Sequence, residues 1–281
     1  LDIKKVTIFI GNQGSGKSTV AKLISTMMWL EKALNRGDIE SIDHLGFKSF
    51  ISYHGIDSYF KVKSDIRFVG DRFYLSYVDR NSTLVQDAAS LYKSPKIIYI
   101  PAERNVLSTT SNLKGLSDNV LTFYEEFRRA SKELSGQQLQ LPINNYSYQY
   151  DEKNETGYVD GDDYKIDMRV ASSGIQSLTP LFVVANNLAN LVTQSDDVIR
   201  RNMNAGSIFD YNFEMAQLEA NDEIDETTKN LKRQEIKDRY LPKCFINIVE
   251  EPEQNLYPSS QRHILNSLLE FNNQSDGNKL I

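Results

Sequence analysis

Short apolar runs that stop at glycine, proline or acidic residues predict buried β-strands at four places along the chain. Residues 6–10 form a β-branched and aromatic run that ends at Gly11, and residues 97–100 form another that ends at a proline. Residues 245–249 are almost wholly apolar, and residues 279–281 begin a fourth run. Because these runs are short and contain few polar positions, they are typical of strands that are covered on both faces.

Helices are predicted where apolar residues recur every three or four positions. The first follows the glycine-rich segment described below and ends at Gly37, and a second begins after a Ser117 cap. A third follows Gly174 and has Pro180 in its first turn, where proline is tolerated. The fourth is predicted to begin at a Ser259 cap.

Three segments follow neither pattern in a simple way. Residues 44–92 alternate polar and apolar side chains and are rich in Tyr and Phe, which predicts antiparallel strands. Residues 143–170 are predicted to form a long β-hairpin with turns at Gly157 and Gly161. Residues 196–241 are dense in charge, and a helix over their second half has a thin apolar face, which indicates an exposed arm or a flexible insertion.

The composition narrows the classes of protein that fit. The chain has 281 residues, of which 40% are apolar and 25% charged, enough for one large core or two modest lobes. A formal net charge of −6 gives no global basic field for nucleic acid, although one lobe can still carry a local basic face. The single Cys244 cannot form an internal disulfide, which favours the cytoplasm, and no run reaches the roughly 18 uninterrupted apolar residues of a membrane span.

The strongest chemical signal is the sequence of residues 11–18, Gly-Asn-Gln-Gly-Ser-Gly-Lys-Ser. It matches G-x-x-x-x-G-K-[ST] in full and lies between a predicted strand and a predicted helix, which is the context of the phosphate-binding P-loop. Glycines let the backbone curl so that several N–H groups face one anion, and the following helix directs its positive end to the same point. A glycine-rich turn with an incidental lysine is the alternative, and chance gives such a match in roughly one chain of this length per hundred.

We therefore expect a nucleoside triphosphate at this loop. The Lys17 ammonium is expected to reach the β- and γ-phosphates and to take part in catalysis, and the Ser18 hydroxyl is expected to bind Mg²⁺. The full set of predicted nucleotide-binding residues is Asn12, Gly14, Ser15, Gly16, Lys17, Ser18 and Thr19.

A second site is predicted where the run 245–249 ends in two carboxylates, Glu250 and Glu251. Hydrolysis of a bound nucleotide needs an acidic residue at the tip of a strand beside the phosphate loop. Glu250 is expected to hold Mg²⁺, and Glu251 is expected to act in catalysis by orienting or deprotonating the attacking water. A solvated pair of glutamates at a strand end is the alternative interpretation.

Three segments together resemble the ABC-type ATPase heads of the OLD-nuclease, RecF and SMC-like group. Residues 249–258, Val-Glu-Glu-Pro-Glu-Gln-Asn-Leu-Tyr-Pro, resemble the E-E-P-E-x-x-L-x-P form of the Walker B segment. Residues 171–176, Ala-Ser-Ser-Gly-Ile-Gln, resemble the L-S-G-G-Q signature, and residues 98–104, Ile-Tyr-Ile-Pro-Ala-Glu-Arg, resemble the strand that leads into the Q-loop. The segments come in the order of the family and span most of the chain.

The resemblance implies a head domain that works in pairs and sandwiches two nucleotides. Ser172, Ser173, Gly174 and Gln176 would then contact the nucleotide of the partner subunit, and Glu103 would stand near the Q-loop glutamine. A serine cap followed by a glycine turn is the simpler interpretation of the signature residues.

Three departures from the family pattern are visible. Glu250 stands where an aspartate is usual, which lengthens the reach to a metal by one methylene. The switch histidine of the family has no match among His44, His54 and His263, which we expect to be surface or packing residues. The charged segment 196–241 separates the signature from the Walker B segment, which disfavours a transporter subunit.

The resemblance further implies an α/β P-loop NTPase fold with a mixed central sheet, an antiparallel β lobe and a helical lobe. The chain would be one ABC-type ATPase domain. Residues 1–112 and 242–281 would form the nucleotide-binding lobe with its antiparallel β part, residues 113–195 a helical and hairpin lobe that ends in the signature, and residues 196–241 a charged helical insertion.

The predicted activity is hydrolysis of ATP, with Mg²⁺, by a cytoplasmic head that dimerises with a second copy of itself around the nucleotide. Its work is expected to be delivered to DNA, RNA or an effector such as a nuclease. Three alternatives stay open: an ATPase subunit of a membrane transporter, a P-loop kinase for a small substrate, and a regulatory clamp that binds ATP with hardly any turnover.

A few other residues have two interpretations each. Arg104 could reach a phosphate or form a surface salt bridge. Tyr53, Tyr59 and Phe60 are candidates to stack on adenine, and no feature of the sequence chooses among them. Cys244 adjoins a predicted buried strand and is expected to be a small core residue rather than a reactive thiol.

Overall fold

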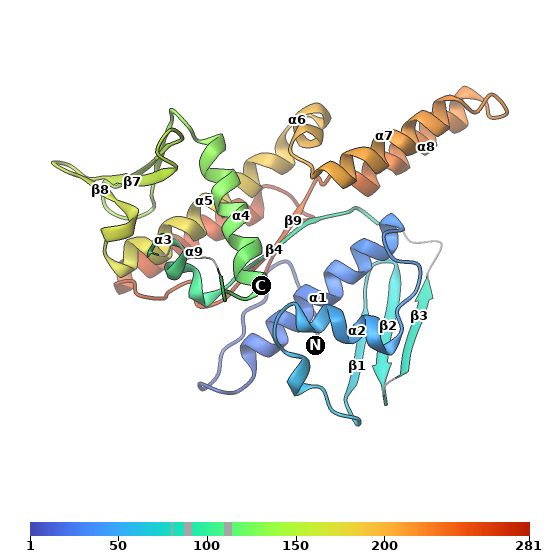
Figure 1. Ribbon diagram of the computed structural model, residues 1–281, viewed down its shortest axis with the longest axis horizontal. Helices are drawn as coiled ribbons and strands as arrows, with labels where there is room; N and C mark the ends of the chain where they lie inside the picture. The colour runs from blue at the N-terminus through green and yellow to red at the C-terminus, as the bar shows by residue number, and fades with distance from the viewer. Residues whose placement is uncertain (80, 87–91, 110–113) are drawn as a thin grey trace.

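The chain is an α/β protein whose described strands form three separate sheets (Figure 1). The computed structural model describes residues 1–79, 81–86, 92–109 and 114–281. The central sheet contains β10 (Lys279–Leu280), β9 (Phe245–Val249) and β4 (Lys96–Ile100) in that order, and all its pairings are parallel. The strands predicted there are confirmed, but this sheet is parallel rather than mixed, because the antiparallel strands pair with one another elsewhere.

Residues 6–10 do not form the predicted buried strand. Val6 makes a single parallel bridge with Leu280, and the Thr7 amide donates to the Leu280 carbonyl over 2.9 Å. Beyond that bridge, no described strand pairs with this segment, and Ile8 and Ile10 are 77% and 89% exposed. A β-branched run forms a strand only where a partner strand lies beside it, and that condition is tertiary.

Helices cover both faces of the central sheet. On one face, Tyr99, Ile246 and Ile248 pack against α1 (Lys17–Arg36). On the other, Ile98, Ile100 and Phe245 belong to the main core with three further helices. These helices are α4 (Asp118–Glu133), α5 (Ser173–Thr193) and α9 (Pro258–Asn273). The alternation of side chains along β4 and β9 therefore fixes a three-layer arrangement.

The predicted helix boundaries are right at some ends and wrong at others. Gly37 ends α1 with φ 77°, as predicted. Ser117 stands at the predicted N-cap position of α4, but its side chain makes no capping hydrogen bond. Pro180 lies beyond the first turn of α5, because that helix already begins at Ser173. Proline at the first position starts α9 at Pro258, so Ser259 lies inside the helix rather than at its cap.

The segment predicted as antiparallel strands, 44–92, begins with helix instead. The Asp43 carboxylate caps α2 by accepting the Gly46 amide over 2.7 Å, and Phe47 and Ile51 bury one face of that helix. The strand prediction is confirmed only for the part that follows, which forms the meander β1-β2-β3. The elements are α2 (His44–Ser52), the 3₁₀ turn η1 (Asp57–Tyr59), β1 (Asp65–Val69), β2 (Phe73–Val78) and β3 (Asn81–Gln86).

A buried carboxylate fastens this meander to α1. Glu31 accepts the backbone amides of Arg72 and Phe73 over 2.8 and 3.3 Å. Burial raises the pKa of Glu31, and the bonds from the two amides oppose that shift. Gly70 is required beside it, because a β-carbon there would overlap the Glu31 carboxylate.

The second antiparallel sheet is a four-stranded meander that includes the predicted hairpin. Gly161 is at a turn as predicted, with its amide bonded to the Tyr164 carbonyl over 2.8 Å. Gly157 was predicted as a turn but lies within β7, where a β-carbon would stand 2.7 Å from the ring of Tyr148. The strands are β5 (Gln138–Gln140), β6 (Ser147–Asp151), β7 (Thr156–Asp160) and β8 (Lys165–Asp167).

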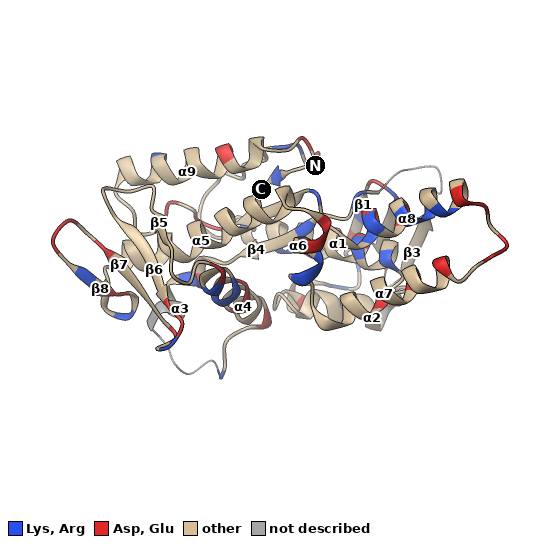
Figure 2. Ribbon diagram, turned by 90° about the horizontal axis from the view of Figure 1, so that it is seen from above, with Lys and Arg blue, Asp and Glu red and all other residues tan. Residues whose placement is uncertain are grey.

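The charged segment forms an arm of two antiparallel helices that projects from the body (Figure 1). One helix was predicted over its second half, but the chain turns back at residues 220–225, where acidic residues gather at the tip (Figure 2). A small core that includes Tyr211, Ile236 and Tyr240, together with Leu191 of α5, holds the arm together and joins it to the body. The two helices of the arm are α7 (Ala205–Glu219) and α8 (Glu226–Tyr240), and the short α6 (Asp196–Arg201) precedes them.

Helix α5 alone among the described helices is long and apolar enough to cross a membrane by length and composition. Most of it is buried, however: 78% of the relevant window lies inside the structure. A core helix of a folded domain gives the same pattern, so α5 is weak support for a membrane span.

Candidate functional site

The glycine-rich loop runs directly into α1, which begins at Lys17. Gly14 and Gly16 have φ of 77° and 89°, a region that residues with a β-carbon rarely adopt. A β-carbon built at either position would meet no atom within 4 Å. The glycines are therefore required by backbone conformation, and the space around the loop is open.

Lys17 holds the loop in its curled form. Its ammonium donates to the carbonyls of Gly11 and Asn12 over 2.8 and 2.9 Å, and the Ser15 amide donates to the Asn12 carbonyl over 3.2 Å. Most of the loop is exposed, including the Ser18 side chain, and Thr19 is half-buried in the first turn of α1. The amides at the helix start and the Lys17 ammonium can therefore be reached by an anion from solvent.

Glu250 follows β9 and is buried at the tip of the central sheet. Its amide donates to the Ile100 carbonyl over 3.0 Å, and its Oε1 atom is buried without a hydrogen-bond partner. The Tyr99 hydroxyl is also buried and makes no hydrogen bond of good geometry, although it lies near the Glu250 carboxylate: burial, the charge of Glu250 and a side-chain contact with it together raise the pKa of Tyr99. An orphaned carboxylate oxygen in such a place is costly unless a cation or a water satisfies it.

Glu251 lies next along the chain but in a different environment. Its side chain is exposed, and its backbone has φ 43°, in the left-handed region that costs a non-glycine residue about 1 kcal/mol or more. The Gln254 amide closes the turn by donating to the Glu251 carbonyl over 3.0 Å. Two adjacent glutamates therefore present one buried and one solvent-facing carboxylate.

The loop and the acidic tip lie at the same end of the sheet but do not touch through polar contacts. Ala21, one turn after Lys17, shares a core cluster with Tyr99 and Ile248, which precede the two strand tips. Within the described residues, no hydrogen bond or ion pair joins residues 11–18 to Glu250 or Glu251.

The predicted signature residues begin α5, and they pack against the acidic turn of the same chain. Ser172 caps the helix by accepting the Ile175 amide over 3.5 Å, and Ser172 and Ser173 are exposed. Gly174 lies so near the turn that a β-carbon would stand 2.8 Å from the Asn255 carbonyl oxygen. The start of α5 therefore presents two hydroxyls to solvent while its glycine contacts the segment after Glu251.

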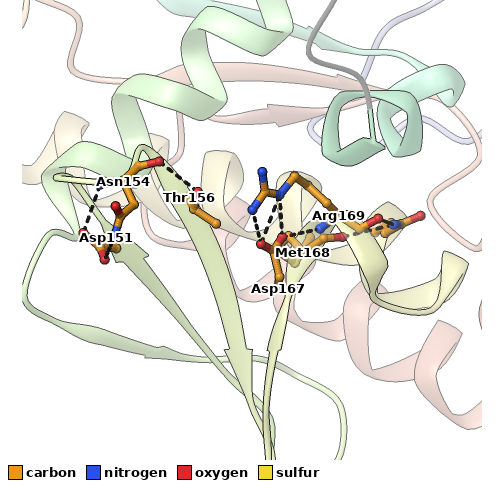
Figure 3. Close-up of polar contacts among 7 residues, drawn as sticks. Asp151, Asn154, Thr156, Asp167, Met168 and Arg169 are labelled. Carbon is orange, nitrogen blue, oxygen red and sulfur yellow. Dashed lines mark hydrogen bonds and ion pairs between the residues drawn. The ribbon is translucent and has the colours of Figure 1, made fainter.

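Gln176 does not point where the resemblance implies. Its side-chain amide donates to the carbonyls of Met168 and Arg169 over 3.0 and 3.2 Å. The residue is buried, so this side chain holds the segment before α5 rather than facing a partner's nucleotide. Arg169 itself is exposed and forms a fork with the Asp167 carboxylate (Figure 3).

Sequence reasoning missed the role of Arg104. Neither of its two interpretations is right: the side chain is completely buried and bonds only carbonyl oxygens. Glu103, by contrast, is exposed in the 3₁₀ turn η2 (Ala102–Asn105), which leads into α3 (Val106–Thr109). The one sequence signal was the position of an arginine three residues after the proline that ends a buried strand.

The candidates for adenine stacking do not converge on the loop. Tyr59 is exposed, and Phe60 packs on Phe47. Tyr53 lines a cavity of about 670 Å³ together with Trp29. On α1 the cavity is lined from Ser25 to Trp29, which lie about 12 to 18 Å beyond Lys17 along the helix axis, so Tyr53 does not face the glycine-rich loop directly.

The remaining predictions concern packing and surface charge. Cys244 is buried as predicted, and burial raises the pKa of its thiol. His54 is buried and packs edge-on against the ring of Tyr99, with the two ring centroids 4.8 Å apart. Two arginines form ion pairs on their own helices, Arg129 with Glu126 and Arg200 with Asp197.

The donor set fits magnesium bound with a nucleotide better than a metal held by protein alone. No group of three or more His, Cys, Asp or Glu side chains in the described part of the chain could hold a metal. Mg²⁺ usually needs only one or two protein oxygens, because phosphate oxygens and waters complete its shell. The Ser18 hydroxyl and the orphaned Glu250 carboxylate have that chemistry.

Comparisons with protein-family models, with curated proteins and with solved structures found no match to this chain.

Proposed function

We propose that this chain is an ATPase head of the P-loop NTPase fold that binds ATP with Mg²⁺ at residues 11–18. The observation that carries the proposal is a complete phosphate-loop sequence at the start of α1, a helix that packs on the strand ending in Glu250. Two left-handed glycines and a helix start with free amides suit the curvature that a triphosphate needs.

In this proposal, each residue of the site has one task. The Lys17 ammonium leaves the carbonyls of Gly11 and Asn12 and neutralises the β- and γ-phosphates. Ser18 and Glu250 supply oxygens to Mg²⁺, which would satisfy the orphaned carboxylate oxygen. Glu251, the exposed carboxylate, orients the water that attacks the γ-phosphorus and accepts its proton.

The proposal requires the loop to approach the acidic tip. Residues 8–10 have no ladder partner among the described residues, so their position is set by few contacts. Nucleotide bound by both the loop and the tip would stabilise the closed arrangement by the difference in affinity between the two states. We therefore expect the exposure of Ile8 and Ile10 to fall on nucleotide binding.

Pairing of two heads is part of the same proposal. The exposed Ser172 and Ser173 hydroxyls and the amides at the start of α5 form a second place where a phosphate could be contacted. Two copies facing each other would bring each α5 start to the other's nucleotide. As the resemblance implies, the resulting cycle of engagement and release would act on nucleic acid or an effector protein.

Two variants test this function. Lys17→Met should weaken binding of a fluorescent ATP analogue at least tenfold, because the main cation for the phosphates is lost. Glu251→Gln should bind the analogue as wild type does but reduce phosphate release roughly a hundredfold or more, because the water loses its base. Binding is measured by fluorescence anisotropy with Mg²⁺, and turnover by phosphate release.

Glu253→Gln is the matched control, since it makes the same change in the same acidic segment outside the predicted site, and it should leave turnover unchanged. If wild type binds ATP and neither wild type nor Glu251→Gln hydrolyses it, the protein is a regulatory clamp and the enzymatic proposal is wrong. If wild type and Lys17→Met bind the analogue equally, residues 11–18 are not the phosphate site.

A further inference from the structure

Arg104 is a buried cation with no carboxylate bonded to it. The residue is 0% exposed, and it is the largest of the completely buried side chains. Burial lowers the pKa of Arg104 to about 10, partly offset by the glutamates around the acidic turn, so the guanidinium keeps its charge at neutral pH. A buried charge is costly unless hydrogen bonds replace its hydration, so this site is built around the guanidinium.

Four carbonyl oxygens surround this guanidinium. Nη1 donates to Pro101 at the end of β4 over 3.1 Å and to Glu250 over 2.7 Å. Nη2 donates to Glu251 over 2.6 Å, and Nε donates to Ser177 in α5 over 3.0 Å. One side chain therefore joins the tip of β4, both residues of the acidic pair and the helix that starts with Ser173.

The start of α5 and the turn after Glu250 are also joined without Arg104. The Asn255 side-chain amide donates to the Ser177 hydroxyl over 3.0 Å. Gly174 packs on the Asn255 carbonyl so closely that no β-carbon fits. The start of α5 and the turn from Glu250 to Asn255 therefore form one rigid contact, with Arg104 at its centre.

We propose that Arg104 is a positioning residue that couples the start of α5 to the backbone of Glu250 and Glu251. The inference rests on the proposed function. The start of α5 would touch the nucleotide of the partner subunit, whereas Glu250 and Glu251 would act on the nucleotide of their own subunit. Arg104 is then the physical link through which engagement of a partner sets the orientation of the catalytic carboxylates.

The chemistry of guanidinium suits this task in two ways. Its planar fork can hold three segments at fixed angles, whereas a lysine ammonium is a compact point charge that cannot span the same carbonyls. Its bond to the Glu251 carbonyl restrains a residue whose φ of 43° is unfavourable for a side chain larger than glycine. Loss of the fork would let the turn relax and move the Glu251 carboxylate without removing it.

The test is Arg104→Lys, which keeps the buried charge and removes the fork. We expect a kcat at least about tenfold below wild type, with the KM for ATP and the affinity for the fluorescent analogue within about threefold, because orientation is lost and not phosphate binding. Arg200→Lys, the same substitution on the exposed α6, should match wild type in both constants. Thermal unfolding of each variant shows whether it is folded.

A double-mutant cycle separates coupling from simple support of the fold. Ser173→Ala should lower kcat on its own because it weakens contact with the partner's nucleotide. If Arg104 transmits that contact, Ser173→Ala has little further effect on kcat in the Arg104→Lys background. If the effects of the two substitutions on kcat multiply, Arg104 supports Glu251 independently of α5, and the proposal that Arg104 couples α5 to Glu251 is wrong.

A second variant covers the case in which Arg104→Lys does not fold. Arg104→Gln removes the buried charge and its desolvation cost but keeps a side-chain amide that can donate to a carbonyl at the same contact between α5 and the turn. We expect it to fold, to lower kcat measurably, and to be non-additive with Ser173→Ala. A folded Arg104→Lys, or in its absence a folded Arg104→Gln, with wild-type kcat overturns the inference alone. A wild-type protein without ATP turnover overturns the proposed function as well.

Discussion

At the scale of single residues, burial of His54 makes the free energy of unfolding depend on pH in a way that the sequence does not predict. Burial, with a smaller contribution from the Lys22 charge, lowers the pKa of His54 from 6.5 to about 4. As the pH falls below 6.5 the unfolded chain takes up a proton that the folded state resists. The free energy of unfolding should therefore fall between pH 6.5 and pH 4, by up to about 3 kcal/mol from this residue.

The prediction is checked by urea unfolding at several pH values for wild type and His54→Phe. The variant keeps an aromatic ring against Tyr99 but cannot titrate, so its stability should vary less over this range. The difference between the two proteins isolates His54 from Glu31, whose raised pKa acts in the opposite direction. Parallel pH profiles for the two proteins would show that His54 takes its proton equally in both states.

At the scale of elements, one side chain decides where α2 begins. The Asp43 carboxylate accepts the Gly46 amide, which has no partner within the helix. Asp43→Ala should cost about 1 kcal/mol in the free energy of unfolding, and Asp43→Asn should cost much less because it can also cap. Denaturant unfolding of the three proteins measures this, and an equal loss in both variants would point to charge rather than to the cap.

At the scale of the whole molecule, the arm is attached at its base and free at its tip. Arg36 of α1 donates to the Ser207 hydroxyl over 2.6 Å and lies 5.2 Å from the Tyr240 ring, which anchors both helices. Towards the tip, the polar contacts of Arg233 are with Glu219, Glu226 and Asn230 of the arm itself. The tip of the arm therefore adds little to the stability of the body.

Replacing residues 219–229 with a short glycine-rich turn should change the free energy of unfolding by less than about 1 kcal/mol, because surface ion pairs contribute little. Arg36→Met should cost about 2 kcal/mol, because it removes a hydrogen bond and a cation–π contact at the base. Thermal and urea unfolding compare the two. A larger loss for the trimmed tip than for Arg36→Met would mean that the arm's far end packs on the body.

The sequence by itself determined the features that depend on near neighbours. The curled loop before Lys17 follows from glycines at 14 and 16, whose positive φ is a local requirement, and the helix after it follows from apolar periodicity. The apolar run of residues 245–249 likewise predicted the buried strand β9, which ends just before Glu250. For the loop and the helix, the deciding interactions lie within a few residues of chain.

Only the tertiary structure decided the features that depend on distant partners. Residues 6–10 have strand composition but pair only through Val6, because their partner lies at the other end of the sequence. Gln176 turns inward to two carbonyls, and Arg104 bonds the carbonyls of residues 146 and 147 positions away. Backbone carbonyls are the same in every residue, so no side-chain pattern can reveal which of them a buried guanidinium will meet. That choice is made only when packing brings three segments to one point.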